Sequence, residues 1–368
     1  MGVNADRNPA FVLRKVKDLA FEDRPVPKLR NSRDVRVHIE QTGICGSDVH
    51  YWQKGSIGKF VLDSPIILGH ESSGTVVEVG EDVPDLEPGD RVSIEPGVPC
   101  RFCDYCRSGN YNHCPDTVFA ATPPHDGTLA NYYLVAHDYC YKIPDSMDFE
   151  EAAMVEPVAV AVQICKRAQL KATDSVVVFG CGPIGLLCQA VAKAYACKKV
   201  IGVDISEGRL AFASKFAADH VYKSPKKNGS EDNASYAARV SQEIIEKFDL
   251  GEGADVILEA TGAPPCIQTG VYVARPGGAR FVQAGMGQEF IDFPVTAALI
   301  KELNWTGSLR YTTGVYPTAV DLVKSGKVNV KPLITNRFKF EEAEKAFELV
   351  KQAREDVIKV IIEGYNPK

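Results

Sequence analysis

Cysteine, histidine and glutamate side chains fall into two groups whose types and spacing suit metal binding. The more compact group is a C-x2-C-x2-C-x7-C array of Cys100, Cys103, Cys106 and Cys114. Four thiolates close a tetrahedral zinc site and leave no position for a substrate. We therefore expect a structural zinc in this lobe. Paired disulfides would need an oxidising compartment, and the odd total of 11 cysteines argues against them.

The second group combines different donor types. Cys45 stands in TGICGSD, His70 and Glu71 in GHESSGTVVEVG, and Glu156 in MVEP. A catalytic zinc takes about three protein ligands and keeps one position open, where it acts as a Lewis acid on an alcohol or a water. Cys45 and His70 supply two ligands. The third is either Glu71 or Glu156; one could bind directly while the other acts through a water.

Three polar residues that follow Cys45 could serve this metal. Asp48 could orient a ligating imidazole, because such histidines usually donate their second N–H to a carboxylate or carbonyl. Ser47 and His50 offer a hydroxyl-to-imidazole path by which a proton leaves a dry site. The simpler alternatives are that Asp48 is a turn residue, that Ser47 caps a helix and that His50 is a surface residue.

A glycine fingerprint follows a strand-like run at 176–179 and precedes a helix-forming segment. In that context the glycines let the backbone approach a pyrophosphate at a helix N-terminus, although a tight turn without a ligand is the alternative. Asp204, nineteen residues after the last glycine, suits the adenosine ribose and favours NAD over NADP. Arg209 lies nearby in the sequence and could permit some use of NADP. The fingerprint residues are Gly180, Gly182, Pro183, Ile184 and Gly185.

The pattern along the chain predicts an α/β protein with two kinds of domain. Short strand-like runs and turn signals occupy residues 35–135, and from residue 175 buried strands alternate with helices, as in a doubly wound parallel sheet. After about residue 304, short strands surround an amphipathic helix at 341–350. We expect a mainly-β catalytic domain at 1–158, an NAD-binding Rossmann domain at 159–298, and a return to the catalytic domain at 299–368.

Composition narrows the kind of partner. Lys plus Arg number 42 against 48 Asp plus Glu, and this net charge of −6 argues against nucleic acid or an anionic membrane as the main partner. The first residues show no signal-peptide pattern, so we expect a cytoplasmic protein that acts on small molecules.

With these residues in view, the chain resembles the zinc-containing medium-chain alcohol dehydrogenase superfamily, and within it the polyol dehydrogenases that act on sorbitol, xylitol or L-arabinitol. The most specific motifs are GHESSGTVVEVG at 69–80, GICGSD at 43–48 and FGCGPIGLL at 179–187. The resemblance implies a GroES-like catalytic domain with a structural zinc lobe, a Rossmann domain, NAD, and one catalytic and one structural zinc per subunit. It also implies a homotetramer.

The resemblance further implies oxidation of a sugar alcohol to a ketose, with xylitol to D-xylulose as the first expectation. Sorbitol (L-iditol) 2-dehydrogenase and L-arabinitol 4-dehydrogenase are the nearest alternatives. A dehydrogenase for another secondary alcohol and a dinucleotide-binding protein without turnover are more distant ones. The implied substrate contacts are Ser47, Tyr51, Ile57, Phe119, Thr122, Glu156 and Arg310.

Overall fold

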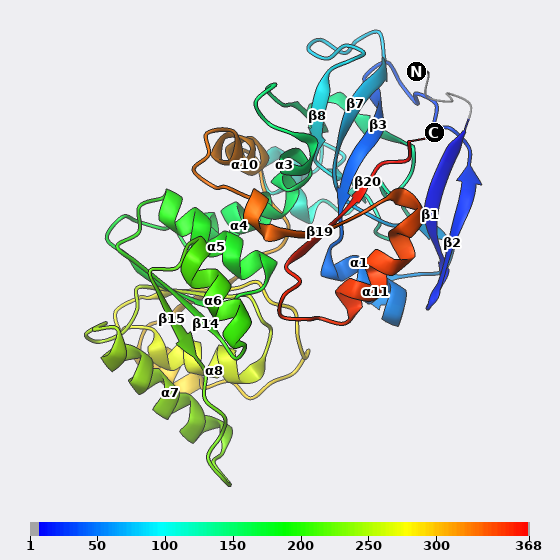
Figure 1. The fold of residues 1–368 in the computed structure, drawn as a ribbon. Helices are drawn as coiled ribbons and strands as arrows, with labels where there is room; N and C mark the ends of the chain where they lie inside the picture. Colours follow the sequence, from blue (N-terminus) through cyan, green and yellow to red (C-terminus); the bar gives the residue numbers. More distant parts are fainter. Residues whose placement is uncertain (1–6, 367–368) are drawn as a thin grey trace. The chain divides into compact units, whose positions relative to one another are not determined.

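The computed structural model describes residues 7–366, which form two compact units (Figure 1). Unit 1 contains the described residues up to Glu156 together with those from Thr312 onward. Unit 2 is the continuous segment Pro157–Tyr311. The chain therefore leaves the first unit once and returns to it once.

Unit 1 is built mainly from β-strands. In the described residues its largest sheet has the strand order β12-β8-β7-β3-β20-β19, and β11 also pairs with β3. A smaller sheet has the order β2-β1-β6. The strands are β1 (Asn8–Lys15), β2 (Asp18–Arg24), β3 (Asp34–Gly43), β4 (Ser56–Ile57), β5 (Phe60–Val61), β6 (Ile66–Ile67), β7 (Glu71–Val79), β8 (Arg91–Ile94), β9 (Gly97–Val98), β10 (Val118–Phe119), β11 (Tyr132–Ala136), β12 (Cys140–Lys142), β19 (Ile334–Phe338) and β20 (Lys359–Glu363).

Strand β3 is central to this unit because β7 lies on one side of it and β20 on the other. Its apolar residues Val35, Val37 and Ile39 are at most 1% exposed and belong to one core cluster with residues of β7 and β8. Burial of these β-branched side chains fixes the strand register, since a slip by one residue would turn them to the opposite face. The register in turn fixes where the strand ends meet.

Short helices flank the sheets of unit 1. A second core cluster includes Phe11, Trp52 and Phe347, and the Phe347 ring centroid lies 5.3 Å from that of Phe11 and 6.2 Å from that of Trp52. These contacts hold α1 and α11 against β1. The helices are α1 (Gly46–Lys54), α2 (Asp104–Arg107), α3 (Phe149–Ala153), α10 (Val315–Lys324) and α11 (Ala343–Lys351), with 3-10 turns η1 (Tyr111–His113), η2 (His137–Tyr139), η3 (Lys331–Leu333) and η4 (Phe340–Glu342). Helix α4 (Val155–Arg167) starts in unit 1 and continues into unit 2.

Unit 2 is a parallel sheet with the strand order β15-β14-β13-β16-β17-β18 among the described residues. Figure 1 shows α5 and α6 on one face of this sheet, and α7 and α8 on the other. Burial on both faces explains why the strands read as continuous apolar runs. The elements are β13 (Ser175–Phe179), α5 (Pro183–Ala194), β14 (Lys199–Asp204), α6 (Glu207–Phe216), β15 (His220–Lys223), α7 (Asn233–Lys247), β16 (Val256–Glu259), α8 (Pro264–Val273), β17 (Arg280–Gln283), α9 (Val295–Ile300) and β18 (Asn304–Gly307).

The expected fold class is confirmed: a doubly wound parallel sheet accompanies a mainly-β unit. The chain returns to unit 1 at Thr312, later than the expected residue 299. Strand β18 pairs in parallel with β17, so residues up to Tyr311 remain in unit 2. The sequence gives no sign that residues 304–307 form a strand that joins the parallel sheet, because a four-residue strand does not identify its partner. Within residues 7–366, no helix has the length and apolar character that a membrane span requires.

Candidate metal and dinucleotide sites

The fold brings Cys45, His70 and Glu71 into one cluster. Their ligand atoms all lie within 4.8 Å of one another. The register of the sheet explains this: Gly43 at the end of β3 pairs with Glu71 at the start of β7, so the residues beside both strand ends converge. A thiolate, an imidazole and a carboxylate in such a group suit a zinc ion with an open position.

Asp48 supports His70 from the first turn of α1. Its Oδ1 lies 3.3 Å from Nδ1 of His70 and accepts a hydrogen bond of 3.2 Å from the Gly69 amide, and its Oδ2 accepts one of 3.2 Å from the Cys45 amide. Nδ1 of His70 has no hydrogen-bond partner among the described residues, so its contact with Asp48 is electrostatic. Asp48 faces Nδ1, which leaves Nε2 for a metal.

The site is electrostatically negative. Burial opposes a charge on His70, but Asp48 and Cys45 outweigh it, and the pKa of His70 is raised well above its usual value. A metal ion would replace that proton, since a ligating histidine must be neutral. The buried carboxylate of Asp48 and the anionic donors therefore fit a divalent cation.

Glu71 also contacts a buried lysine that was not predicted. Nζ of Lys359 lies 2.8 Å and 2.6 Å from the two carboxylate oxygens of Glu71 and donates to the carbonyl of Ile44 at 3.1 Å. Lys359 is 4% exposed and Glu71 is 1% exposed. The available signal in the sequence was a lone lysine inside the apolar run VIKVIIEG.

The other predicted residues of the metal site lie at different depths. Glu156, in the first turn of α4, is 5% exposed and is not part of the 4.8 Å group of Cys45, His70 and Glu71. Ser47 is half-buried and His50 is exposed, both on α1. The exposure of His50 is what a residue at the outer end of a proton path requires.

The substrate contacts implied by the resemblance are distributed unevenly. The Phe119 ring lies 5.9 Å from the His70 ring, and Thr122 is 8% exposed. Tyr51 and Ile57 belong to or pack against the apolar cluster around Phe11. Arg310 is half-buried in unit 2, after β18, and its backbone has a left-handed φ of 50°.

The four predicted lobe cysteines form the second cluster, with ligand atoms within 4.8 Å of one another. The Sγ–Sγ distances are 3.9 Å for Cys100–Cys106 and 3.4 Å for Cys103–Cys106. A tetrahedral zinc with sulfur ligands at about 2.3 Å places the sulfurs about 3.8 Å apart. Amide donors from Cys103 and Phe102 lower the pKa of Cys100 to about 7, which favours a thiolate.

A buried carboxylate, Glu95, connects this lobe to the sheet. Glu95 follows β8 and is fully buried, and its carboxylate accepts hydrogen bonds from the hydroxyl of Tyr111 in η1 and, at 2.8 Å, from that of Tyr141 in β12. Burial raises the pKa of Glu95 to about 7, against the opposing effect of the two tyrosine donors. The residue stands in SIEPG, where sequence alone gives no sign of these partners.

The glycine fingerprint forms the turn from β13 into α5. A side chain at Gly185 would strike the carbonyl oxygen of Gly180, whereas one at Gly182 would meet nothing within 4 Å. Gly182 is also the N-cap of α5, with Pro183 and Ile184 in the first turn. An open backbone at a helix N-terminus suits a pyrophosphate.

Asp204 ends β14 beside this turn. Its Oδ2 accepts a hydrogen bond of 2.7 Å from the Cys181 amide and its Oδ1 one of 2.9 Å from the Ser206 amide. These bonds hold a carboxylate at the position where a dinucleotide ribose is expected. Arg209 is half-buried in the first turn of α6.

Glu259, at the end of β16, was also not singled out from the sequence. It is fully buried and accepts hydrogen bonds of 2.9 Å from the amides of Thr261 and Gly262, and of 2.7 Å from the side chain of Gln283. Thr261 also restricts which residue can occupy position 180, because a side chain at Gly180 would meet the methyl carbon of Thr261 at 2.8 Å. The visible signal was a charged residue ending the buried strand ADVILEATG.

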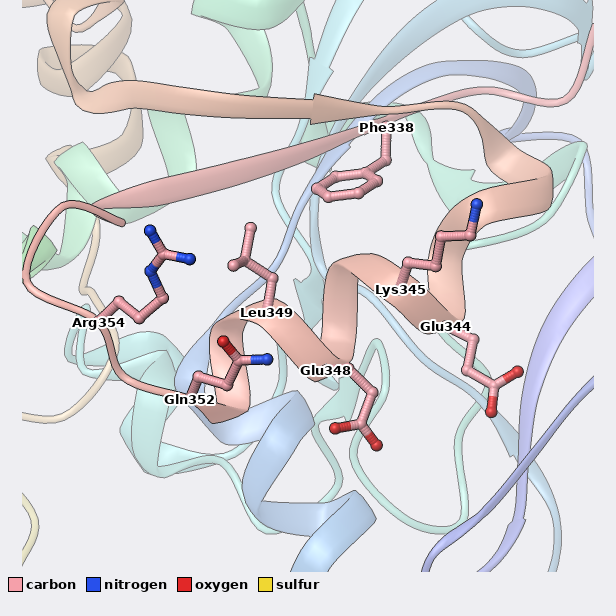
Figure 2. Close-up of a pocket in the computed structure, with 7 residues that line it drawn as sticks. All are labelled: Phe338, Glu344, Lys345, Glu348, Leu349, Gln352 and Arg354. Carbon is pink, nitrogen blue, oxygen red and sulfur yellow. The ribbon is translucent and has the colours of Figure 1, made fainter.

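A shallow pocket of about 530 Å³ lies beside α11, and Figure 2 shows the residues that line it. Phe338 and Leu349 give it an apolar wall, while Glu344 and Arg354 are among the charged residues at its edge. Its lining residues include none of the predicted site residues. The pocket is therefore distinct from both metal clusters and from the glycine turn.

Comparison with known proteins identifies the family of this chain. Residues 31–145 match the alcohol dehydrogenase GroES-like domain, and residues 183–325 match the zinc-binding dehydrogenase family. D-xylulose reductase A of Aspergillus oryzae is 52% identical over 358 residues, which is 97% of each chain. The protein is thus a dehydrogenase.

Solved structures of dehydrogenases also match almost the whole of this chain. L-idonate 5-dehydrogenase of Escherichia coli is 29% identical with a TM-score of 0.86, and the match covers 97% of this chain and 98% of that one. An alcohol dehydrogenase of Escherichia coli CFT073 complexed with NADH is 27% identical with a TM-score of 0.87, covering 97% and 99% of the two chains. The chain belongs to the zinc-containing medium-chain alcohol dehydrogenase superfamily, in its polyol dehydrogenase group.

Proposed function

We propose that this protein is an NAD-dependent polyol dehydrogenase that oxidises xylitol to D-xylulose. The observation that carries the substrate assignment is the 52% identity to D-xylulose reductase A over 97% of both chains. The cluster of Cys45, His70 and Glu71 supports the chemistry, because its mixed donors suit a zinc that activates an alcohol.

Cys45, His70 and Glu71 hold the catalytic zinc in this proposal, and Asp48 fixes the orientation of His70. Glu71 is preferred to Glu156 as the direct carboxylate ligand because it lies in the 4.8 Å group and Glu156 does not. Glu156 is 5% exposed and belongs to the same unit as the cluster, and in this proposal it acts through a water. When bound, zinc makes a coordinated hydroxyl easier to deprotonate, and NAD accepts a hydride.

Ser47 and His50 carry the released proton. Ser47 is half-buried and His50 is exposed on the same helix, and in this proposal the proton passes from the hydroxyl to the imidazole and then to solvent. Proton transfer through a positioned side chain typically contributes about 10²–10⁴-fold to a rate. Ser47 therefore both contacts substrate and receives its proton.

The remaining substrate contacts divide into three kinds. Phe119 provides an apolar ring beside His70, and Thr122, whose amide donates to the carbonyl of Phe119, provides a hydroxyl. Tyr51 and Ile57 form a supporting wall, because both pack with the apolar cluster of unit 1. Arg310 is suited to hydrogen-bond several hydroxyls of a sugar alcohol through its five N–H donors.

Unit 2 binds the dinucleotide. The open backbone at Gly182 and the N-terminus of α5 receive the pyrophosphate, and Asp204 accepts hydrogen bonds from the adenosine ribose. A carboxylate at this position repels a 2′-phosphate, so NAD is preferred, and Arg209 allows limited use of NADP. The four lobe cysteines hold the structural zinc.

Initial rates with xylitol, sorbitol, L-arabinitol and ribitol, each with NAD and with NADP, test the assignment. The largest kcat/KM is expected for xylitol with NAD. A larger value for sorbitol or L-arabinitol would reassign the enzyme to the corresponding polyol. Turnover of ethanol or 2,3-butanediol without turnover of any polyol would contradict the proposal.

We also propose a cytoplasmic homotetramer. The cysteines are all unpaired, as suits a reducing compartment. In unit 2, β18 is an edge strand with Trp305 52% exposed, and the adjacent α9 exposes Leu299 and Ile300, each 74%. An edge strand with exposed apolar neighbours commonly pairs with another chain. Analytical ultracentrifugation of the wild type and of Trp305→Glu tests this, and a monomeric wild type would contradict it.

A further inference from the structure

Lys359 is a buried cation in direct contact with a carboxylate that the proposed function assigns to zinc. Its Nζ lies 2.8 Å and 2.6 Å from the two oxygens of Glu71. A third contact, 3.1 Å to the carbonyl of Ile44, also uses this ammonium group. The three donors of the lysine thus have partners, and both oxygens of Glu71 are engaged.

The sheet explains how two residues so far apart in the chain meet. Strand β3 lies between β7 and β20, with Gly43 of β3 opposite both Glu71 and Ile361. Glu71 must therefore reach across Gly43 to contact Lys359. A side chain at Gly43 would collide with the Glu71 carboxylate. The absence of a side chain at position 43 opens the path between the two charges.

The contact has a consequence for the metal site. A carboxylate has about four lone-pair positions, and those that accept hydrogen bonds from an ammonium group donate less strongly to a metal. The site already contains Cys45 and Asp48 as potential anions, so the charge of Lys359 offsets part of the negative charge that attracts a divalent cation. Lys359 should thus affect both the position of Glu71 and its strength as a ligand.

We propose that Lys359 is a positioning residue that shares the Glu71 carboxylate with the zinc, holding it across Gly43 and restraining its donation to the metal. This rests on the proposed function, in which Glu71 is a zinc ligand. The restraint keeps the zinc electron-poor, which favours activation of an alcohol. It also makes the zinc easier to remove than it would be with a free carboxylate.

The test compares zinc release in Lys359→Met, Lys359→Arg and the wild type, together with the visible spectra of their cobalt-substituted forms. In Lys359→Met the release of zinc to a chelator should slow by about 10-fold and the cobalt spectrum should shift, because Glu71 donates fully. Lys359→Arg keeps a positive charge and N–H donors, so its release rate should stay within about 3-fold of wild type. Lys345→Met, on the exposed face of α11, is the matched control.

A double-mutant cycle separates this role from a structural one. If Lys359 acts through Glu71, Lys359→Met should change zinc release by less than about 2-fold in a Glu71→Gln background. This double variant removes both buried charges together. Lys359→Gln, which keeps an N–H donor without the charge, should slow zinc release in the same direction, and it decides the test if Lys359→Met alone does not fold.

Metal content and the rate of zinc release together distinguish failure of the proposed function from failure of this inference. A wild-type chain that contains two zinc ions, and a Cys45→Ala variant that contains one, support the proposed function. If Cys45→Ala loses no metal, the proposed function and this inference both fail. If the metal content is as expected but folded Lys359→Met or Lys359→Gln releases zinc as fast as wild type, with an unchanged cobalt spectrum, the inference alone is overturned.

Discussion

The two cysteine-containing clusters of unit 1 are assembled in opposite ways. The lobe of Cys100, Cys103, Cys106 and Cys114 comes from one short segment, and its sulfurs are positioned by local turns and amide donors. The Cys45 cluster depends on β3, β7 and β20, and the contact between Glu71 and Lys359 spans 288 positions in the chain. The first is a local structure, whereas the second exists only in the folded sheet.

The surroundings of the two clusters also differ: one has local amide donors and the other has charged neighbours from distant segments. Three of the lobe cysteines are half-buried, and the sulfurs of Cys100 and Cys114 accept hydrogen bonds from amides of their own segment. His70 and Glu71 are buried, and Asp48 and Lys359 face them as charged neighbours. A closed thiolate site needs little beyond its own ligands, while an open site needs partners that keep its ligands in place. The comparison predicts different effects when each cluster is damaged.

The largest effect is expected for His70→Ala. Loss of this ligand should lower kcat/KM for xylitol by at least about 10³-fold, equivalent to about 4 kcal/mol of transition-state stabilisation. Zinc content should fall from two ions to one per chain by elemental analysis, while circular dichroism stays unchanged. His220→Ala, in β15 of unit 2, is the control. Retained turnover in zinc-depleted His70→Ala would remove the Cys45 cluster from the chemistry.

Cys103→Ser should act on stability rather than on turnover. We expect the free energy of unfolding to fall by about 3 kcal/mol, because metal binding by the lobe contributes to folding. The melting temperature checks this, with Cys266→Ser in unit 2 as the control thiol. Turnover at low temperature should fall by less than about 10-fold. Complete loss of turnover in a folded variant would show that the two clusters are not independent.

Asp48→Asn tests the support around His70. Removal of this negative charge should weaken zinc binding at the Cys45 cluster by about 10–100-fold, without effect on the lobe. Competition with a chelator of known affinity measures the change for each zinc ion. The exposed Asp63, changed in the same way, is the matched control. Equal weakening of both zinc ions would contradict a separate role for Asp48.

The smallest effect concerns Glu95, which joins the lobe to the sheet through Tyr111. Its pKa is raised to about 7 in the folded protein, above the value of 4.5 in the unfolded chain, so the folded state binds the proton more tightly. The free energy of unfolding should therefore fall by about 1–2 kcal/mol as the pH rises from 5 to 7.

Glu95→Gln cannot titrate and should reduce this pH dependence by the same amount. Chemical unfolding at several pH values between 5 and 8 provides the measurement. Glu81→Gln, a residue at a surface turn, should leave the slope unchanged. An identical slope in wild type and Glu95→Gln would mean that the buried carboxylate does not titrate in this range.

Sequence reasoning was most informative where the geometry is local. The lobe spacing, the glycine fingerprint and Asp204 each depend on a short segment, and their geometry follows from turn and helix-end stereochemistry. It was less informative for Tyr51, whose role as a substrate contact stays a prediction while its side chain is 4% exposed in the apolar cluster. It also placed the return to unit 1 at 299, because nothing in a four-residue strand identifies its partner.

By itself, the sequence determined the α/β fold class, the grouping of the four lobe cysteines and a glycine turn between a strand and a helix, because periodicity, ligand spacing and glycine positions act over a few residues. Only the tertiary structure decided that Glu71 joins Cys45 and His70, that Lys359 contacts that carboxylate across Gly43, and that Glu95 holds the lobe through Tyr111. These pairings depend on sheet register and on burial, which exist only once distant segments have packed.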